Sequence, residues 1–205
     1  MTEFIDQISQ IATDPLSFFR FFGYSGLAMI LFAETGLFGF FLPGDSLLIT
    51  LGLISVNGEI DVHKMVPILT IATILGDHFS YYLGLKFSPW IYKNSEKLFI
   101  NEEHLKKAVV FYEAHGGKTI MISKFVAFVR TFAPFVAGAS GMKYFRFMIY
   151  DIIGAIVWVA GLIYLGHYIG KKFDFDIKEY FHYFVIFLGI LIISPLLFKF
   201  FKKKS

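Results

Sequence analysis

The fold is decided by one 32-residue stretch, Ser25–Val56, which reads SGLAMILFAETGLFGFFLPGDSLLITLGLISV. It carries two acids, Glu34 and Asp45, in mainly apolar surroundings, and its centre is rich in glycine. A helix needs about 20 residues to cross a membrane core about 30 Å thick, so the stretch is too long for one straight span. Split at Pro43–Gly44, each half forms a helix of roughly 20–30 Å. The stretch therefore predicts two half-length helices in a re-entrant hairpin.

The composition of the whole chain indicates a lipid bilayer as its solvent. Hydrophobic residues make up 56% of the 205 residues and charged residues 17%, against roughly 25% charged in soluble proteins. The aromatic share of 20% excludes a disordered chain. The absence of cysteine from the sequence excludes disulfides, iron–sulfur clusters and cysteine nucleophiles. A net charge of +3 is too small to indicate nucleic acid, and no cofactor or metal is expected.

Three further apolar stretches follow the first: Met65–Leu85, Thr119–Ile169 and Phe181–Phe198. Charge, Pro134 and Gly138 interrupt Thr119–Ile169, which predicts a second re-entrant hairpin. Each half has an amphipathic helix, a broken apolar segment and an unbroken span, a pattern of transporters whose binding sites lie at the breaks. The predicted architecture is an all-α integral membrane protein, an inverted repeat of two hairpins with transmembrane helices. Amphipathic surface helices are expected at Met1–Asp14 and around Glu102–His115.

The predicted boundaries describe a single membrane domain, 1–205. Repeat 1 covers about 1–85, an amphipathic linker about 86–118, repeat 2 about 119–170, and a C-terminal transmembrane helix covers 181–201.

The distribution of positive charge favours the re-entrant arrangement. With both hairpins re-entrant and the C-terminus cytoplasmic, twelve of the 19 Lys and Arg residues lie inside and two are embedded. Five then lie outside: Arg20, Lys64, Lys171, Lys172 and Lys178. If both broken stretches crossed fully, seven would lie inside and ten outside. The re-entrant arrangement also orients the two halves oppositely, as an inverted repeat requires.

Five charges stand in apolar surroundings: Glu34, Asp45, Asp77, Lys124 and Arg130. At a helix centre each costs roughly 2.5–3.5 kcal/mol, so five isolated charges would cost on the order of 12–17 kcal/mol. The three acids belong to the first half and the two bases to the second. We therefore expect opposite charges to meet where the two hairpins pack.

Each of these charges has a structural and a functional interpretation. Glu34 is either a proton carrier or one side of an ion pair with Lys124 or Arg130. Asp77 is either a proton-coupling residue or a buried hydrogen-bonded group. Arg130 and Lys124 either capture an anionic headgroup or neutralise the acids, and arginine has the planar fork that suits phosphate. Asp45 is a site residue, a helix cap, or both.

Glycines and prolines beside these charges form the predicted structural motif. Pro43 ends the first half-helix, and Gly44 permits the tight turn that follows. Gly76 precedes Asp77, while Pro134 and Gly138 occupy the second broken stretch.

The ordered motifs resemble the DedA family of bacterial membrane proteins, which is related to the SNARE-associated Golgi (VTT domain) proteins. The matching residues are Glu34, Leu42-Pro43-Gly44-Asp45-Ser46-Leu47-Leu48, Gly76-Asp77, Tyr81, Gly84, Lys124-Phe125, Arg130-Thr131, Pro134, Ala137-Gly138, Met142, Phe147, Gly154 and Trp158. The family usually has arginine where this chain has Lys124. The resemblance implies two membrane-inserted hairpins, an acidic pair at Glu34 and Asp45, and a basic pair at Lys124 and Arg130. It also implies a link to the proton motive force and to lipid movement, including undecaprenyl phosphate recycling and phospholipid flipping.

The function expected from these features is transport of a phosphate-bearing lipid between leaflets, coupled to protons. Arg130 and Lys124 bind the substrate, and Glu34, Asp45 and Asp77 couple protons. Expected partners are membrane lipids and protons, in a multi-pass protein of the bacterial inner membrane. Two alternatives are a proton-coupled exchanger of a small ion and a non-transporting assembly or partner-binding protein. An enzyme is not expected, because the chain has no nucleophile elbow and no phosphate loop.

Overall fold

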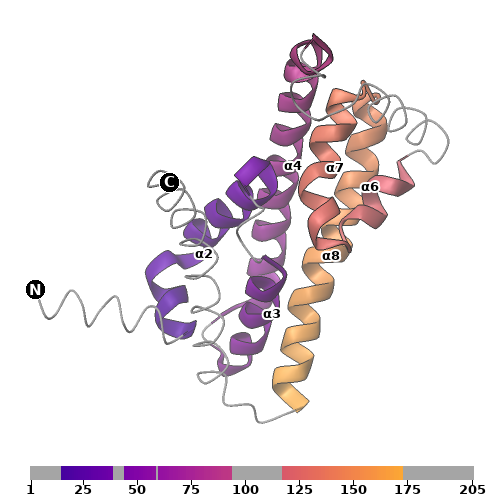
Figure 1. The fold of residues 1–205 in the computed structure, drawn as a ribbon. Helices are drawn as coiled ribbons and strands as arrows, with labels where there is room; N and C mark the ends of the chain where they lie inside the picture. Colours follow the sequence, from indigo (N-terminus) through magenta and orange to yellow (C-terminus); the bar gives the residue numbers. More distant parts are fainter. Residues whose placement is uncertain (1–14, 39–43, 59, 94–116, 173–205) are drawn as a thin grey trace, which may run out of the picture. The chain divides into compact units, whose positions relative to one another are not determined.

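A computed structural model describes residues 15–38, 44–58, 60–93 and 117–172 (Figure 1). Every regular element in these ranges is helical, which confirms the all-α prediction there. The elements are α2 (Pro15–Ala33), the π-helical turn η1 (Glu34–Phe38), α3 (Gly44–Ile54), the 3-10 turn η3 (Ser55–Asn57), α4 (Val62–Lys93), α6 (Lys118–Ser123), α7 (Ala127–Ala139) and α8 (Tyr144–Lys172). The expected surface helices at Met1–Asp14 and Glu102–His115, Pro43 and the helix at 181–201 lie outside the described residues.

Two of the described helices, α3 and α7, are short, and two, α4 and α8, are long. The 11 residues of α3 and the 13 of α7 extend about 17 and 20 Å, which is short of a membrane core of about 30 Å. The 32 residues of α4 and the 29 of α8 exceed that thickness. Among the described helices, α8 alone is both long and apolar enough to cross a membrane, with a mean hydropathy of 2.0.

Two boundaries differ from the sequence-based expectation. α4 continues to Lys93, eight residues beyond the expected end of the span at Leu85. The second broken stretch is interrupted between Ser123 and Ala127 and again between Ala139 and Tyr144, and Pro134 lies inside the continuous helix α7. The prediction that Pro134 breaks this stretch is therefore wrong. Pro134 has no N–H to donate to the carbonyl of Arg130, yet the helix tolerates this loss of one bond, as apolar helices often do.

The chain forms two compact units, each described here by itself. The first comprises Met1–Leu27, Phe41–Val66 and Leu162–Ser205. The second comprises Ala28–Phe40 and Pro67–Gly161.

In the first unit, α3 and α8 touch backbone to backbone at Gly52 and Gly166. A Cβ added to Gly52 would collide with the carbonyl of Ile163, three residues before Gly166. A Cβ added to Gly166 would collide with the carbonyl of Ile49, three residues before Gly52. Only glycine at both positions allows this approach.

The second unit repeats this crossing with α7 and α4. A Cβ on Gly138 would collide with the carbonyl of Tyr81, three residues before Gly84. A Cβ on Gly84 would collide with the carbonyl of Phe135, three residues before Gly138. In both units, the short helix of one half of the sequence packs on the long helix of the other half.

Hydrogen bonds close the turn between α7 and α8 and join it to α4. Gly141 has a φ of 73°, and the amides of Gly141 and Met142 donate to the carbonyls of Gly138 and Ala137, which closes α7. The hydroxyl of Tyr81 on α4 donates to the carbonyl of Met142.

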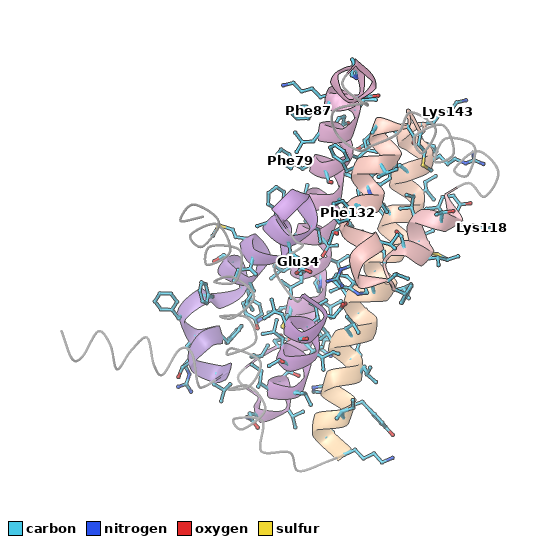
Figure 2. All side chains as sticks on the ribbon, in the orientation of Figure 1. Glu34, Phe79, Phe87, Lys118, Phe132 and Lys143 are labelled. Carbon is cyan, nitrogen blue, oxygen red and sulfur yellow. The ribbon has the colours of Figure 1, made fainter. Side chains whose placement is uncertain are left out.

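Large apolar side chains cover the outside of the second unit. Phe79 and Phe87 on α4 and Phe132 on α7 each expose more than two fifths of their surface (Figure 2). Such broad apolar exposure is typical of a surface that faces lipid or another protein.

Candidate functional site

The first ion pair of the site joins η1 to α7. Arg130 Nη2 donates to Glu34 Oε1 at 2.6 Å, and the two side chains are 5% and 0% exposed. The guanidinium carbon of Arg130 also lies 4.4 Å from the ring centroid of Trp158 on α8. A buried arginine is thus held by a carboxylate and by an aromatic face, two groups that both favour its charge.

The second ion-pair group centres on Lys124, which lies in the break between α6 and α7. Lys124 Nζ donates to Asp77 of α4 and lies 2.8 Å from Asp151 Oδ1 of α8. The three side chains are no more than 3% exposed. One ammonium group therefore contacts two buried carboxylates.

Small residues make room for both groups. A Cβ on Gly154 of α8 would lie 3.1 Å from Lys124 Cγ, so glycine lets the lysine stem pass. A Cβ on Gly76 of α4 would collide with Thr35 Oγ1 and lie 2.7 Å from the carbonyl of Phe32. Gly76 thus allows the start of η1, where Glu34 is located, to approach α4.

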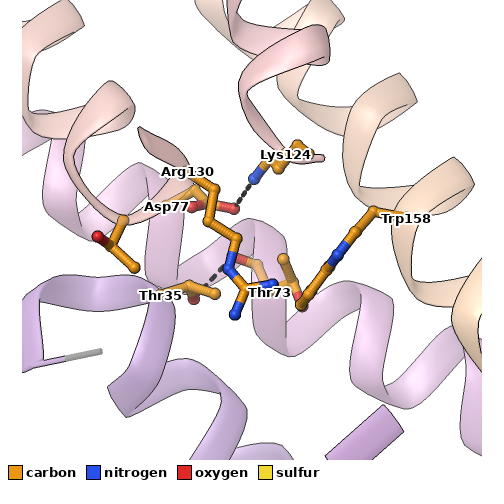
Figure 3. Close-up of a pocket in the computed structure, with 7 residues that line it drawn as sticks. Thr35, Thr73, Asp77, Lys124, Arg130 and Trp158 are labelled. Atoms are coloured by element: carbon orange, nitrogen blue, oxygen red, sulfur yellow. Dashed lines mark hydrogen bonds and ion pairs between the residues drawn. The ribbon is translucent and has the colours of Figure 1, made fainter. Parts of the chain in front are cut away.

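A small pocket lies between the two groups, lined by Thr35, Thr73, Asp77, Lys124, Arg130, Thr131 and Trp158 (Figure 3). Thr35 Oγ1 lies 3.1 Å from the carbonyl of Leu31 and 3.3 Å from that of Thr73, which ties η1 to α4. The side chains leave no space of the size of a water molecule in the pocket. In this arrangement both bases contact carboxylates of the chain.

The structure brings together four of the five charges singled out in the sequence. Glu34 meets Arg130 and Asp77 meets Lys124, so the expected contact between acids of the first half and bases of the second is present. Asp45 lies in the first turn of α3, in the first unit. Its expected roles as a site residue and a helix cap stay predictions.

Asp151 is absent from the sequence-based prediction, although it is 0% exposed and contacts Lys124. A signal for it exists: apolar residues occupy the positions from Met148 to Ile153 on either side of it. His78 is a second neighbour of this group, with Nε2 3.8 Å from Asp151 Oδ2. Among the described residues there is no group of three or more potential metal ligands.

The ring of Trp158 gives a direct test of how firmly Arg130 is held. We expect Trp158→Leu to destabilise the protein by about 2 kcal/mol more than Trp158→Phe, because a desolvated cation–π contact contributes about that much. Unfolding in mixed micelles measures the difference. Equal losses in the two variants would show that Trp158 acts only by filling volume.

Comparison with known proteins places these residues in a family. Residues 42–168 match the VTT domain. The chain is 44% identical over 150 residues to the protein DedA of Escherichia coli (strain K12), covering 72% of this chain and 68% of that protein. The chain belongs to the DedA family. The VTT match includes Asp77, Lys124, Arg130 and Asp151, whereas Glu34 precedes it.

Other DedA-family relatives carry names that place them in membranes. The inner membrane protein YqjA of E. coli (strain K12) is 34% identical over 149 residues, covering 72% of this chain and 68% of that protein. An uncharacterized membrane protein of Mycobacterium leprae (strain TN) is 35% identical over 157 residues, covering 77% and 71%. This DedA-family chain is accordingly a membrane protein. No solved structure matches it.

Proposed function

We propose that this DedA-family protein moves a phosphate-bearing lipid, such as undecaprenyl phosphate or a phospholipid, between leaflets, coupled to protons. The observation that carries the proposal is the buried contact of Arg130 with Glu34 beside that of Lys124 with its two aspartates. Guanidinium and ammonium groups are the side chains that bind phosphate best in proteins. No chemical change of the lipid is part of the proposal.

The proposed mechanism is an exchange of partners at Arg130. A proton on Glu34 removes the negative charge that Arg130 contacts, so the guanidinium can bind a lipid phosphate instead. Loss of that proton restores the carboxylate, which competes with the phosphate and releases the lipid. Protonation and phosphate binding are coupled because both act on one cation. Lys124 and Asp45 assist as the second base and second acid.

The proposed architecture is an inverted repeat of two re-entrant hairpins in a multi-pass protein of the bacterial inner membrane. It is supported by the short helices α3 and α7, and by the glycine crossings that recur with the same spacing in both units. In an inverted repeat the hairpins contribute equivalent half-helices, and the binding site lies where they meet.

Reconstitution into liposomes tests the function. Labelled polyprenyl phosphate and labelled phospholipid are followed between leaflets, each with and without a pH gradient. We expect Arg130→Gln to slow transport roughly 10- to 100-fold, the factor for losing one charge-assisted hydrogen bond. The matched control is Lys64→Gln, which removes an exposed positive charge outside the site and leaves transport unchanged. Transport that survives Glu34→Gln combined with Arg130→Gln rejects the proposal, and ion flux without lipid favours an ion exchanger.

A further inference from the structure

The buried charges of the second unit do not balance. Three carboxylates (Glu34, Asp77 and Asp151) are at most 1% exposed, and two cations (Lys124 and Arg130) are at most 5% exposed. With all five charged and His78 neutral, this part of the chain holds one negative charge in excess. A buried charge without compensation is costly, and a carboxylate in that position takes up a proton.

The distances indicate where that proton resides. Glu34 has the guanidinium of Arg130 at 2.6 Å, whereas Asp77 and Asp151 contact the same ammonium of Lys124. Two carboxylates that share one site cannot both remain ionised easily, and one of them keeps a proton. The excess negative charge therefore falls on the aspartate pair.

Asp151 provides a second, independent observation. Its Oδ2 is buried and has no hydrogen-bond donor among the residues that the structure describes. Oδ2 points toward His78, whose Nε2 lies 3.8 Å away and also lacks a hydrogen bond within the described ranges. An ionised oxygen in this position would lack any compensating donor, whereas a protonated one would be neutral.

His78 is the more exposed member of this contact. Its side chain is 15% exposed, while that of Asp151 is fully buried. The imidazole ring lies against Tyr144 and Phe147, with ring centroids 5.5 Å away in each case. An imidazole between a buried acid and the surface is suited to pass a proton between them.

We propose that Asp77 and Asp151 share one dissociable proton beside Lys124, and that this proton exchanges with the outside through His78. The inference rests on the proposed function in one respect: it takes this proton to be the one that is coupled to lipid transport. The charged and titratable groups that act on the pair are His78 on α4, Lys124 before α7, Arg130 on α7 and Tyr144 at the start of α8. Glu34 in η1 contacts Arg130.

Infrared spectroscopy of the purified full chain in lipid tests the proposal without requiring transport. The wild-type protein should show the band of a protonated carboxyl group at neutral pH, and the band should shift in deuterated water. Asp151→Asn should abolish it, because two carboxylates then balance two cations. Asp77→Asn should do the same, and Asp61→Asn, which removes an exposed acid, should leave it unchanged.

Charge-conserving variants identify the group that carries the proton. Asp151→Glu or Asp77→Glu should move the band, and Glu34→Asp should leave it in place. His78→Phe should keep the band but slow its hydrogen–deuterium exchange about 10-fold or more. A wild-type spectrum without the band overturns the proposal, as does a band that moves with Glu34→Asp alone. Unchanged exchange in His78→Phe overturns the role of His78. If the band is present and lipid transport is absent, the proton site stands and the proposed function fails.

Discussion

Replacing Arg130 with glutamine is expected to destabilise the protein by about 3–5 kcal/mol, because Glu34 loses the cation that it contacts in the buried interior. Arg130 Nη2 lies 2.6 Å from Glu34 Oε1, and both side chains are almost entirely buried. The glutamine side chain carries no charge to compensate the carboxylate. The free energy of unfolding in mixed micelles measures the loss.

The matched experiment adds Glu34→Gln to the same protein. The double variant, Glu34→Gln with Arg130→Gln, should recover most of the lost stability, because neither charge is then left buried alone. Lys64→Gln, which removes an exposed positive charge, should change stability by less than about 0.5 kcal/mol.

Transport by the double variant separates a structural pair from a functional one. If the pair serves only to fold the protein, the restored protein should transport lipid normally. If Arg130 binds phosphate, the restored protein stays inactive. Failure of the double variant to regain stability would instead show that Glu34 and Arg130 are not coupled energetically.

The glycine crossings give the second large effect. Gly138→Ala should destabilise the protein by about 1–3 kcal/mol or more, because the new methyl group would overlap the backbone carbonyl of Tyr81. Backbone cannot move aside as a flexible side chain can, so α7 and α4 must separate. Gly52→Ala should have an effect of the same size in the first unit, where it meets the carbonyl of Ile163.

Gly161 on α8 is the matched control for these variants. A Cβ there meets nothing within 4 Å, so Gly161→Ala should be neutral or stabilise the helix by up to about 1 kcal/mol. Thermal unfolding in detergent compares the three variants. Similar stabilities for Gly138→Ala and Gly161→Ala would contradict the close approach of α7 and α4.

The contact between acids and bases could be predicted from the sequence, because it follows from the free-energy cost of an isolated charge in apolar surroundings. Charges such as Glu34 and Arg130 cannot stay single among apolar residues, so some pairing is forced. The choice of partners could not be predicted, since it depends on how the helices pack. Lys124 contacts Asp77 and Asp151, an arrangement that requires α4, α8 and the α6–α7 break to converge.

Local signals also explain the errors at the second broken stretch. Proline is the strongest helix breaker, which favours a break at Pro134, but its place in α7 costs only one backbone bond. The observed break contains no glycine or proline in Lys124–Val126. Amides of Phe125 and Val126 donate to carbonyls three residues back, and Lys124 contacts two acids there. The break therefore coincides with the charge of Lys124, one of the interruptions that the sequence indicates, and with its tertiary contacts, whereas Pro134 stays helical.

The way in which the short helices meet the long ones bears on how such a protein can change over time. A contact between two backbones depends little on the identity of neighbouring side chains. Residues around the crossing can therefore be replaced without separating the two helices. Positions around each crossing can consequently differ between the two units while the crossing itself is kept. The constraint that the two crossings share then falls on four positions, Gly52, Gly84, Gly138 and Gly166, where a Cβ would collide with backbone.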